Sequence, residues 1–287
     1  MKPAVDVLVV THGTAELTAD ALRRLLDSDQ GAELRLLVHD NASPDATLAV
    51  LADRVPEAAV VASPVNAGFA AGVNALVARS TAPWLLVLNS DAWPAPGAVG
   101  ALVDVLAAHP LAGLVAPRLA SPGGDLELSA FPFPSVRGAV RAALLREPHP
   151  VAPAEVDWVV GACWLVRREA ALDAGPLDES LFMYGEDVAW CWALRQRGWR
   201  VRYEPPALVM HVGNASGSAR FDDETRTRTW VANDLRLYPR WGRAPRLYRW
   251  VRVLGALRAA RLASDEGTRA HWRAVARAYR TSRSGPS

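Results

Sequence analysis

Polar side chains that could bind a metal follow an apolar run near residue 90. Residues 85–88 are uninterrupted and apolar, and Asn89, Ser90 and Asp91 come directly after them. A carboxylate at the end of a buried strand can bind Mg²⁺ or Mn²⁺, which take oxygen ligands from carboxylates and from substrate phosphates. The alternative is that Asp91 caps a helix that begins near Pro94 or Pro96. On this segment alone the two interpretations have about equal support.

Two further polar segments could contact a nucleotide. Asp40 follows a second apolar run, and its carboxylate could accept a hydrogen bond from the N3–H group of a pyrimidine. Alternatively, the segment is the turn before a helix that begins at Pro44 with Ser43 as its cap. Residues 66–74 read NAGFAAGVN, and small residues that open a helix can offer N–H groups to a phosphate or a ribose. The alternative for Gly72 is close packing of the helix on a sheet.

The second half of the chain holds an acidic pair and a histidine. Glu186 and Asp187 begin a predicted helix, where the helix dipole favours their ionised forms, and an ionised carboxylate can serve as a general base. An ordinary acidic first turn is the alternative. His211 follows the strand-like residues 207–210 and precedes a Gly/Ser loop. It is therefore a candidate metal ligand or phosphate donor, with a purely structural histidine as the alternative.

The elements that must position these residues alternate between strand and helix. Apolar runs at 5–10, 34–38, 60–61, 84–88 and 114–116 are predicted strands. Helical patterns at 15–27, 44–54, 69–78 and 96–108 separate them. Such alternation predicts an α/β fold with a mostly parallel sheet flanked by helices, in which ligands bind beyond the carboxyl ends of the strands. Residues from 222 onward are predicted to be helical, with breaks at Pro239, Gly242 and Pro245.

Composition restricts the class of protein. A formal net charge of +2 over 287 residues argues against a nucleic-acid partner. No run of about 18 apolar residues predicts a transmembrane helix, and the start of the chain lacks a signal-peptide pattern. We therefore expect a cytoplasmic protein, and the many Ala and Arg residues with almost no Lys are typical of a GC-rich bacterium. Cys163 and Cys191 are expected to be buried free thiols rather than a disulfide.

Six motifs together resemble the family 2 glycosyltransferases with a GT-A fold, and in particular their rhamnosyltransferase-like branch. The resemblance spans roughly residues 4–240. Five motifs match in order and spacing, and the last matches loosely through His211, Asn214 and Ser216. The motifs are D-N-A-S from 40, N-x-G-F-x-x-G-x-N from 66, N-S-D-A from 89, G-A-C-W-L-V-R-R from 161, F-M-Y-G-E-D from 182 and H-x-x-G-x-S from 211.

This resemblance implies an inverting hexosyltransferase that moves a sugar or deoxysugar, with rhamnose as one example, from a nucleoside-diphosphate sugar such as a dTDP- or UDP-sugar to a hydroxyl acceptor. Asp187, with Glu186 beside it, would be the base, and Asp91 with His211 would hold Mg²⁺ or Mn²⁺. The donor would be bound by residues at the strand ends and in the 66–74 loop. These implied donor-binding residues are Thr11, Asp40, Asn66, Gly68, Asn74, Asn89, Ser90 and Asp91.

The sequence departs from the family pattern at three places. Asn89 stands where the metal motif usually begins with an acid, and His12-Gly13 replaces an aromatic residue followed by Asn or Arg. Trp190 and Trp192 flank Cys191 after the acidic pair. Two alternatives are kept: a nucleotidyltransferase, which can share a similar α/β sheet, and a catalytically silent sugar-nucleotide-binding protein, which Asn89 and His12-Gly13 leave open. The first lacks support because residues 11–14 carry no Lys or Arg.

Residues 1–220 are predicted to form the catalytic domain, with a nucleotide-sugar half at 1–117 and an acceptor half at 118–220. Residues 221–287 form a helical segment rich in Arg and Trp. Two interpretations of this segment remain open. In the first, its arginines contact the anionic inner face of the cell membrane. In the second, the segment is a helical cap with solvated arginines that packs on the core or on a second subunit of a homodimer.

Overall fold

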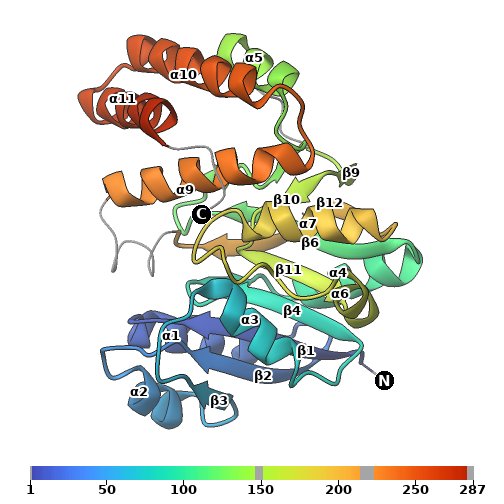
Figure 1. The fold of residues 1–287 in the computed structure, drawn as a ribbon. Helices are drawn as coiled ribbons and strands as arrows, with labels where there is room; N and C mark the ends of the chain where they lie inside the picture. The colour runs from blue at the N-terminus through green and yellow to red at the C-terminus, as the bar shows by residue number, and fades with distance from the viewer. Residues whose placement is uncertain (1, 146–150, 214–222, 283–287) are drawn as a thin grey trace. The chain divides into compact units, whose positions relative to one another are not determined.

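The computed structural model describes residues 2–145, 151–213 and 223–282 (Figure 1). The chain forms two compact units. The first contains Met1–Phe131, Pro150–Phe182 and Glu186–Ala219, and the second contains Pro132–His149, Met183–Gly185 and Arg220–Ser287. The division therefore does not follow chain order, and the boundary predicted at residue 220 lies outside the described residues.

The first unit is built on a mixed sheet. Its main path runs, in spatial order, β3 (Ala59–Ala62), β2 (Glu33–Asp40), β1 (Ala4–Thr11), β4 (Trp84–Asn89), β11 (Cys163–Arg167), β6 (Ala112–Ala120), β12 (Arg200–His211) and β5 (Ala92–Pro94). The first four strands of this path are parallel, and so are β6 and β12. The short strands β7 (Leu126–Glu127) and β9 (Ala154–Val156) pair with β6 and β12. Separately, β8 (Ala130–Phe131) pairs with β10 (Trp158–Val159).

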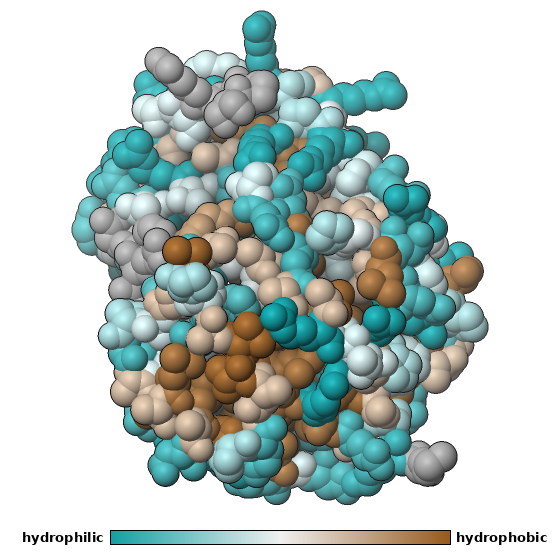
Figure 2. Space-filling view, turned by 60° about the horizontal axis from the view of Figure 1, so that its bottom comes forward, coloured by the Kyte–Doolittle hydropathy of each residue, from teal (hydrophilic) through white to brown (hydrophobic). Residues whose placement is uncertain are grey.

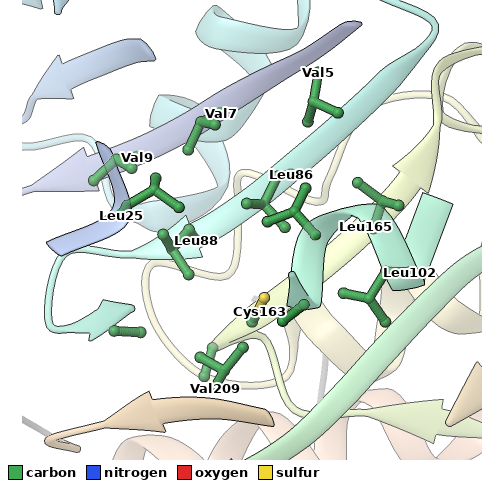
Figure 3. Packing of buried hydrophobic residues seen from close by; sticks show 14 of the residues in the cluster. Val5, Val7, Val9, Leu25, Leu86, Leu88, Leu102, Cys163, Leu165 and Val209 are labelled. Atoms are coloured by element: carbon green, nitrogen blue, oxygen red, sulfur yellow. The ribbon is translucent and has the colours of Figure 1, made fainter. Parts of the chain in front are cut away.

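Helices cover both faces of this sheet. One core joins the sheet to α1 (Ala15–Asp27), α2 (Thr47–Arg54) and α4 (Ala98–Ala108). The other core joins it to α3 (Phe69–Val77), α6 (Arg168–Ala174) and α7 (Glu186–Gln196). Successive side chains of β1 enter opposite cores, as Figure 3 illustrates for the first core, where Val5, Val7 and Val9 lie beside Leu86 and Leu88. Burial on both faces explains the continuous apolar run of β1.

The predicted α/β fold with a mostly parallel sheet flanked by helices is confirmed, but one predicted helix begins later than expected. α2 starts at Thr47 instead of Pro44, and its N-cap is Ala46 instead of Ser43. The hydroxyl of Ser43 accepts a hydrogen bond from the N–H of Gly13 instead, at 2.9 Å. The Asp45 carboxylate accepts from the N–H of Thr47, at 3.2 Å, and so ends the turn that precedes the helix.

The second unit is helical. It contains α5 (Val136–Leu144), α9 (Asp223–Leu237), a 3₁₀ turn at Tyr238–Arg240, α10 (Pro245–Leu262) and α11 (Glu266–Thr281). Helical structure beyond residue 222 with a break around Pro239 was predicted. α5 joins this unit although it lies far earlier in the chain: a Cβ atom built on Gly255 would lie 3.1 Å from Cβ of Ala143, and Arg258 donates to the carbonyl oxygen of Ala143 at 2.9 Å.

A partly buried polar network lies in the core of the second unit. The hydroxyl groups of Tyr248 and Tyr279 both donate to the Asp234 carboxylate, and the Arg252 guanidinium donates to the Tyr279 hydroxyl at 2.9 Å. Tyr248 also stacks on Tyr238 with a centroid distance of 3.9 Å. The hydroxyl groups of both buried tyrosines therefore have partners, as a stable core requires.

No helix within the described ranges is long and apolar enough to cross a bilayer. On the face that Figure 2 shows, hydrophilic residues cover much of the surface and hydrophobic residues gather in one part of it.

Both cysteines are free and buried, as predicted.

Candidate functional site

Three predicted site residues lie at the carboxyl ends of adjacent parallel strands. Thr11, at the end of β1, is in register with Asp40, at the end of β2. On the other side of β1, Val10 is in register with Asn89, at the end of β4. The sheet therefore brings Thr11, Asp40 and Asn89 to one edge, the position where open α/β sheets bind ligands.

The Asp40 carboxylate has one unused acceptor. The side chain is only 2% exposed, and its Oδ2 accepts a hydrogen bond from the N–H of Ser43 at 3.2 Å. Its Oδ1 is buried and has no hydrogen-bond partner among the described residues. Leaving such an atom unpaired costs about 1–3 kcal/mol, so an N–H group of a ligand would be bound favourably there.

A cluster of hydroxyl groups lies behind this edge. The Thr11 hydroxyl is 2.9 Å from that of Thr18 and 3.1 Å from that of Thr14. The Thr14 hydroxyl is in turn 3.4 Å from that of Ser90, which is 4% exposed. The cluster thus connects two predicted donor-binding residues, Thr11 and Ser90, through the first turn of α1.

The 66–74 loop is fixed to the strand edge by Asn41. The Asn41 amide donates to the carbonyl oxygen of Gly68 at 3.0 Å and accepts from the N–H of Ala67 at 3.1 Å. Gly68 has a φ of +92°, and a Cβ atom there would lie 2.6 Å from the carbonyl oxygen of Phe182. Only glycine fits this position, so the loop closely approaches the segment that precedes the acidic pair.

Other residues of the loop form bonds within the chain. The Asn66 side chain accepts from the N–H of Gly68 at 3.0 Å. Asn74 donates to the carbonyl oxygen of Leu177 at 3.0 Å and accepts from the N–H of the same residue at 2.9 Å, so it fastens that segment to α3. A Cβ atom on Gly72 would lie 2.7 Å from Val10, so this glycine serves close packing of α3 on the sheet.

Asp91 and His211 form a buried pair. They are 4% and 7% exposed, and Oδ1 of Asp91 lies 3.5 Å from Nε2 of His211. The backbone sets this approach, because β5 pairs with the end of β12 and the N–H of Val212 donates to the carbonyl oxygen of Asp91 at 3.0 Å. Asp91 does not cap a helix: α4 begins only at Ala98, its N-cap is Gly97, and no side chain caps it. The helix-cap alternative is therefore wrong.

The other ring nitrogen of His211 contacts Glu127, which the sequence did not indicate. Nδ1 lies 2.9 Å from Oε2 of Glu127, so the Nδ1–H group donates to that carboxylate. Nε2 then points to Asp91 and to the Asn89 amide, 3.3 Å away. Burial lowers the pKa of His211, but hydrogen bonds and charges from Asp91 and Glu127 outweigh it, so the pKa lies above the usual value.

The Asp91–His211 pair fits a divalent cation in its chemistry. A carboxylate oxygen and an imidazole nitrogen face each other, and both suit Mn²⁺. Within the described residues no group of three or more His, Cys, Asp or Glu side chains converges as a metal site. Glu127 contacts the far side of the imidazole ring and therefore orients it. The remaining ligands would have to be water and phosphate oxygens.

Glu186 and Asp187 differ in environment although they are neighbours. Glu186 is 8% exposed, and its Oε2 has no hydrogen-bond partner among the described residues. Burial, together with the charge of Asp187, raises the pKa of Glu186 to about 8. The Asp187 carboxylate is less buried and accepts from the N–H of Val188 at 2.8 Å. The two adjoining carboxyl groups thus differ in burial and in hydrogen bonding, as in sites that assign such groups different tasks.

A short segment links Asp187 to the strand edge. A Cβ atom on Gly161 would lie 3.7 Å from Cβ of Asp187. The carbonyl oxygen of the next residue, Ala162, accepts from the N–H of Asn89 at 2.9 Å. The acidic pair Glu186–Asp187 and the Asp91–His211 pair therefore belong to one region of the first unit. Asn214 and Ser216, the end of the last motif, lie outside the described residues.

The family follows from a comparison of the sequence with protein-family models. Residues 6–172 match the model of glycosyl transferase family 2. The chain belongs to this family. The matched range contains the strand-edge residues Thr11, Asp40 and Asn89. The family match does not favour a nucleotidyltransferase.

Two proteins of Mycobacterium tuberculosis are similar in sequence. An N-acetylglucosaminyl-diphospho-decaprenol L-rhamnosyltransferase is 33% identical over 201 residues, which are 61% of this chain and 66% of that protein. A pre-mycofactocin glycosyltransferase is 32% identical over 222 residues, or 75% of this chain and 42% of that protein. The match thus spans just under two thirds of the first relative and less than half of the second.

Solved structures share the fold. A mannosyltransferase from Pyrobaculum calidifontis, in complex with GDP-Man and Mn²⁺, has a TM-score of 0.64 at 17% identity and covers 98% of this chain and 88% of its own. GalNAc-T7, with UDP, GalNAc and Mn²⁺, has a TM-score of 0.62 at 13% identity and covers 99% and 55%. The predicted GT-A fold is therefore confirmed.

Proposed function

We propose that this protein transfers a deoxyhexose, with L-rhamnose as the first choice, from a dTDP- or UDP-sugar to a hydroxyl acceptor with inversion at the anomeric carbon. The main support is the convergence at one sheet edge of the buried Asp40 carboxylate, with its unused acceptor, and the Asp91–His211 pair. The name of the 33% identical relative supports rhamnose as the sugar.

On this proposal, Oδ1 of Asp40 accepts the N3–H of a thymine or uracil base. Asp91 and His211 hold Mn²⁺ or Mg²⁺, with Glu127 orienting the imidazole. When bound, the cation supplies positive charge beside the diphosphate that departs from the sugar. The strand-edge hydroxyl and amide groups of Thr11, Ser90 and Asn89 complete the donor site.

Asp187 is the proposed base. The neighbouring Glu186 keeps its proton near neutral pH because burial raises its pKa to about 8, so the negative charge of the pair rests on Asp187. The Asp187 carboxylate removes the proton of the acceptor hydroxyl as that oxygen bonds to the anomeric carbon. The bond from this carbon to the diphosphate breaks, and the nucleoside diphosphate leaves with the bonding electrons.

The test compares Asp187→Asn with Glu186→Gln. We expect Asp187→Asn to keep donor affinity within about twofold while turnover falls by about 10²-fold or more, the usual contribution of a general base. Glu186→Gln replaces a protonated carboxyl with a neutral amide and should retain most of the activity. Nucleotide release with and without acceptor measures turnover, and calorimetry measures donor binding. Full activity of Asp187→Asn would remove this residue from the mechanism.

The donor itself can be found by thermal shift. A ligand that binds the native state raises its apparent stability by RT ln(1 + [L]/Kd), which is about 2.7 kcal/mol at 100 times Kd. A panel of UDP-, dTDP- and GDP-sugars with Mn²⁺ should therefore show the largest shift for a dTDP- or UDP-sugar. Slow hydrolysis of that donor without acceptor would separate an enzyme from a silent binding protein.

We also make two proposals about the basic segment 221–287, and neither depends on the proposed transfer reaction. Peripheral contact with an anionic membrane predicts co-sedimentation with phosphatidylglycerol vesicles that weakens with salt. Association of two copies predicts a doubled mass in light scattering. A protein that is monomeric in light scattering and does not co-sediment with the vesicles would contradict both proposals.

A further inference from the structure

The second unit contains a cavity rich in arginine. Its volume is about 810 Å³, within the range of small-molecule sites. Five arginines line it, and none of the described lining residues is Asp or Glu. We call it the arginine cavity, and its lining is Leu235, Arg236, Tyr238, Pro239, Arg240, Pro245, Arg246, Arg249, Trp250, Val253 and Arg280. Such an excess of positive charge in a concave site favours an anion that can accept hydrogen bonds from guanidinium groups.

The backbone around the arginine cavity adds to this field. Pro245 begins α10, an 18-residue helix with no side-chain cap and no acidic residue in its first turn. Arg246 lies in that first turn and Arg249 directly follows it, so their positive charge opposes the helix dipole. Arg249 is held in place by the carbonyl oxygens of Tyr279 and Arg280, both at 2.5 Å. A bound anion would offset the unfavourable charge and would meet an arginine that is already fixed.

An exposed apolar surface begins at the same cavity. Trp250 lines the cavity and is 61% exposed. Leu247, Leu254 and Leu257 are exposed as well, and their spacing of three and four residues places them with Trp250 along one side of α10. We call these four residues the α10 stripe. A soluble anion alone would leave the stripe in water.

We propose that the arginine cavity and the α10 stripe together bind an amphiphile whose head is a phosphate or diphosphate and whose tail is a hydrocarbon chain. The head would accept hydrogen bonds from the guanidinium groups of Arg246 and Arg280. The tail would lie along the stripe from Trp250 towards Leu257. This proposal concerns binding by the second unit. It does not depend on the proposed transfer reaction, so either can fail alone.

Three water-soluble probes separate the parts of such a ligand. Geranyl diphosphate carries both head and tail, inorganic pyrophosphate carries the head, and geraniol carries the tail. With the full chain in calorimetry, we expect geranyl diphosphate to bind at least about tenfold more tightly than either partial probe, since burying a few methylene groups alone gives this gain. Equal affinity for pyrophosphate and geranyl diphosphate would indicate a free-phosphate site and overturn the amphiphile.

The head is tested by two double variants of equal charge. Arg246→Gln with Arg280→Gln removes two cavity arginines, whereas Arg261→Gln with Arg277→Gln removes two exposed arginines of α10 and α11 that do not line the cavity. The first pair should weaken geranyl diphosphate binding about tenfold or more, because charge-assisted hydrogen bonds are lost, and the second less than about twofold. Equal weakening by both pairs would reduce the effect to general surface charge and overturn the site.

The tail is tested by Leu254→Ala, with Leu262→Ala as its control on the same helix. Both leucines are exposed, at 62% and 68%, so neither change should disturb folding, and circular dichroism would verify this. Leu254→Ala should weaken geranyl diphosphate about threefold and leave pyrophosphate unchanged, while Leu262→Ala should affect neither. No difference between the two variants would remove the tail from the proposal.

Discussion

The Glu186 carboxyl couples the stability of the fold to pH. Its folded pKa of about 8 lies above the ordinary value of 4.5, so the native state holds a proton that the unfolded state releases across that interval. Stability from this group is therefore fully present below pH 4.5 and is lost as pH rises towards 8. A carboxyl group that is neutral in the native state can be replaced by an amide at little cost.

Glu186→Gln should consequently stabilise the protein, and more so at high pH. Between pH 5 and pH 8 the gain in unfolding free energy over the unaltered chain should grow by at least about 1 kcal/mol. Urea denaturation at several pH values measures it. Glu33→Gln, an exposed change at the start of β2, is the control and should show no such trend. A gain independent of pH would contradict the buried, protonated state.

Glu127 positions the proposed metal ligand. Glu127→Ala removes the acceptor for Nδ1–H of His211, so the imidazole loses its orientation. We expect Mn²⁺-dependent donor binding to weaken by about 10–100-fold, as for other residues that orient metal ligands, with little change in donor binding without metal. Asp125→Asn, an exposed change two residues earlier, should leave both unchanged. Fluorescence titration with and without Mn²⁺ tests this.

Residues at strand ends were predictable, and residues brought in by distant pairing were not. Asp40 and Asn89 follow local apolar runs, so their place at one sheet edge follows from chain pattern and parallel topology. Glu127 reaches His211 because β7 folds back on β6 while β12 lies along the other side of β6. No local pattern encodes a contact between residues 84 positions apart.

At the scale of elements, the Gly68 turn controls the start of α3. Alanine there combines two penalties, a φ of +92° and a Cβ atom 2.6 Å from the carbonyl oxygen of Phe182. Gly97, at the start of α4, has a φ of +77° but nothing within 4 Å of a built Cβ atom. Gly97→Ala should therefore cost about 1 kcal/mol from backbone strain alone, and Gly68→Ala at least about 2 kcal/mol.

Urea midpoints of the two alanine variants measure this difference, and donor binding adds a second measurement. Gly68→Ala should also weaken donor binding, because the loop held by Asn41 would shift. If both variants lose the same stability, the contact with Phe182 does not constrain the loop.

Element boundaries show which local signals decide. α1 covers residues 15–27 as predicted because its apolar periodicity is strong and unopposed. α2 begins three residues later than the proline suggested, because Ser43 bonds to Gly13 across the strand edge and Asp45 closes a turn. Residues 207–210, predicted as strand-like, proved to be the end of the longer strand β12, which has a register shift between Glu204 and Leu208. Contacts with residues distant in the chain therefore set the start of α2 and the extent of β12.

At the scale of the whole molecule, the division into units predicts which regions a mutation loosens. Ala139 is 7% exposed and belongs to the core of the second unit. Ala139→Glu should therefore increase hydrogen exchange in α10 and α11 more than in β1 and β4, although both helices begin more than 100 residues further along the chain. Mass spectrometry of exchanged peptides measures this.

Leu165→Ala serves as the matched change in the first unit. Leu165 is fully buried in the core that joins β11 to α4, and its loss should cost about 2–5 kcal/mol. Its effect on exchange should fall on β4 and β11 rather than on α10 and α11. A uniform increase everywhere in both variants would mean that the two units open together.

The early place of α5 in the chain has a consequence for synthesis on the ribosome. α5 ends at Leu144, whereas its packing partner α10 begins at Pro245, about 100 residues later. At about 5–20 residues per second, the helix waits roughly 5–20 s for that partner to be made. Leu144 and Leu145 are 62% exposed even in the finished protein. The nascent chain thus exposes a hydrophobic segment for that whole interval. Residues 136–145 are therefore the expected binding site of a chaperone during translation.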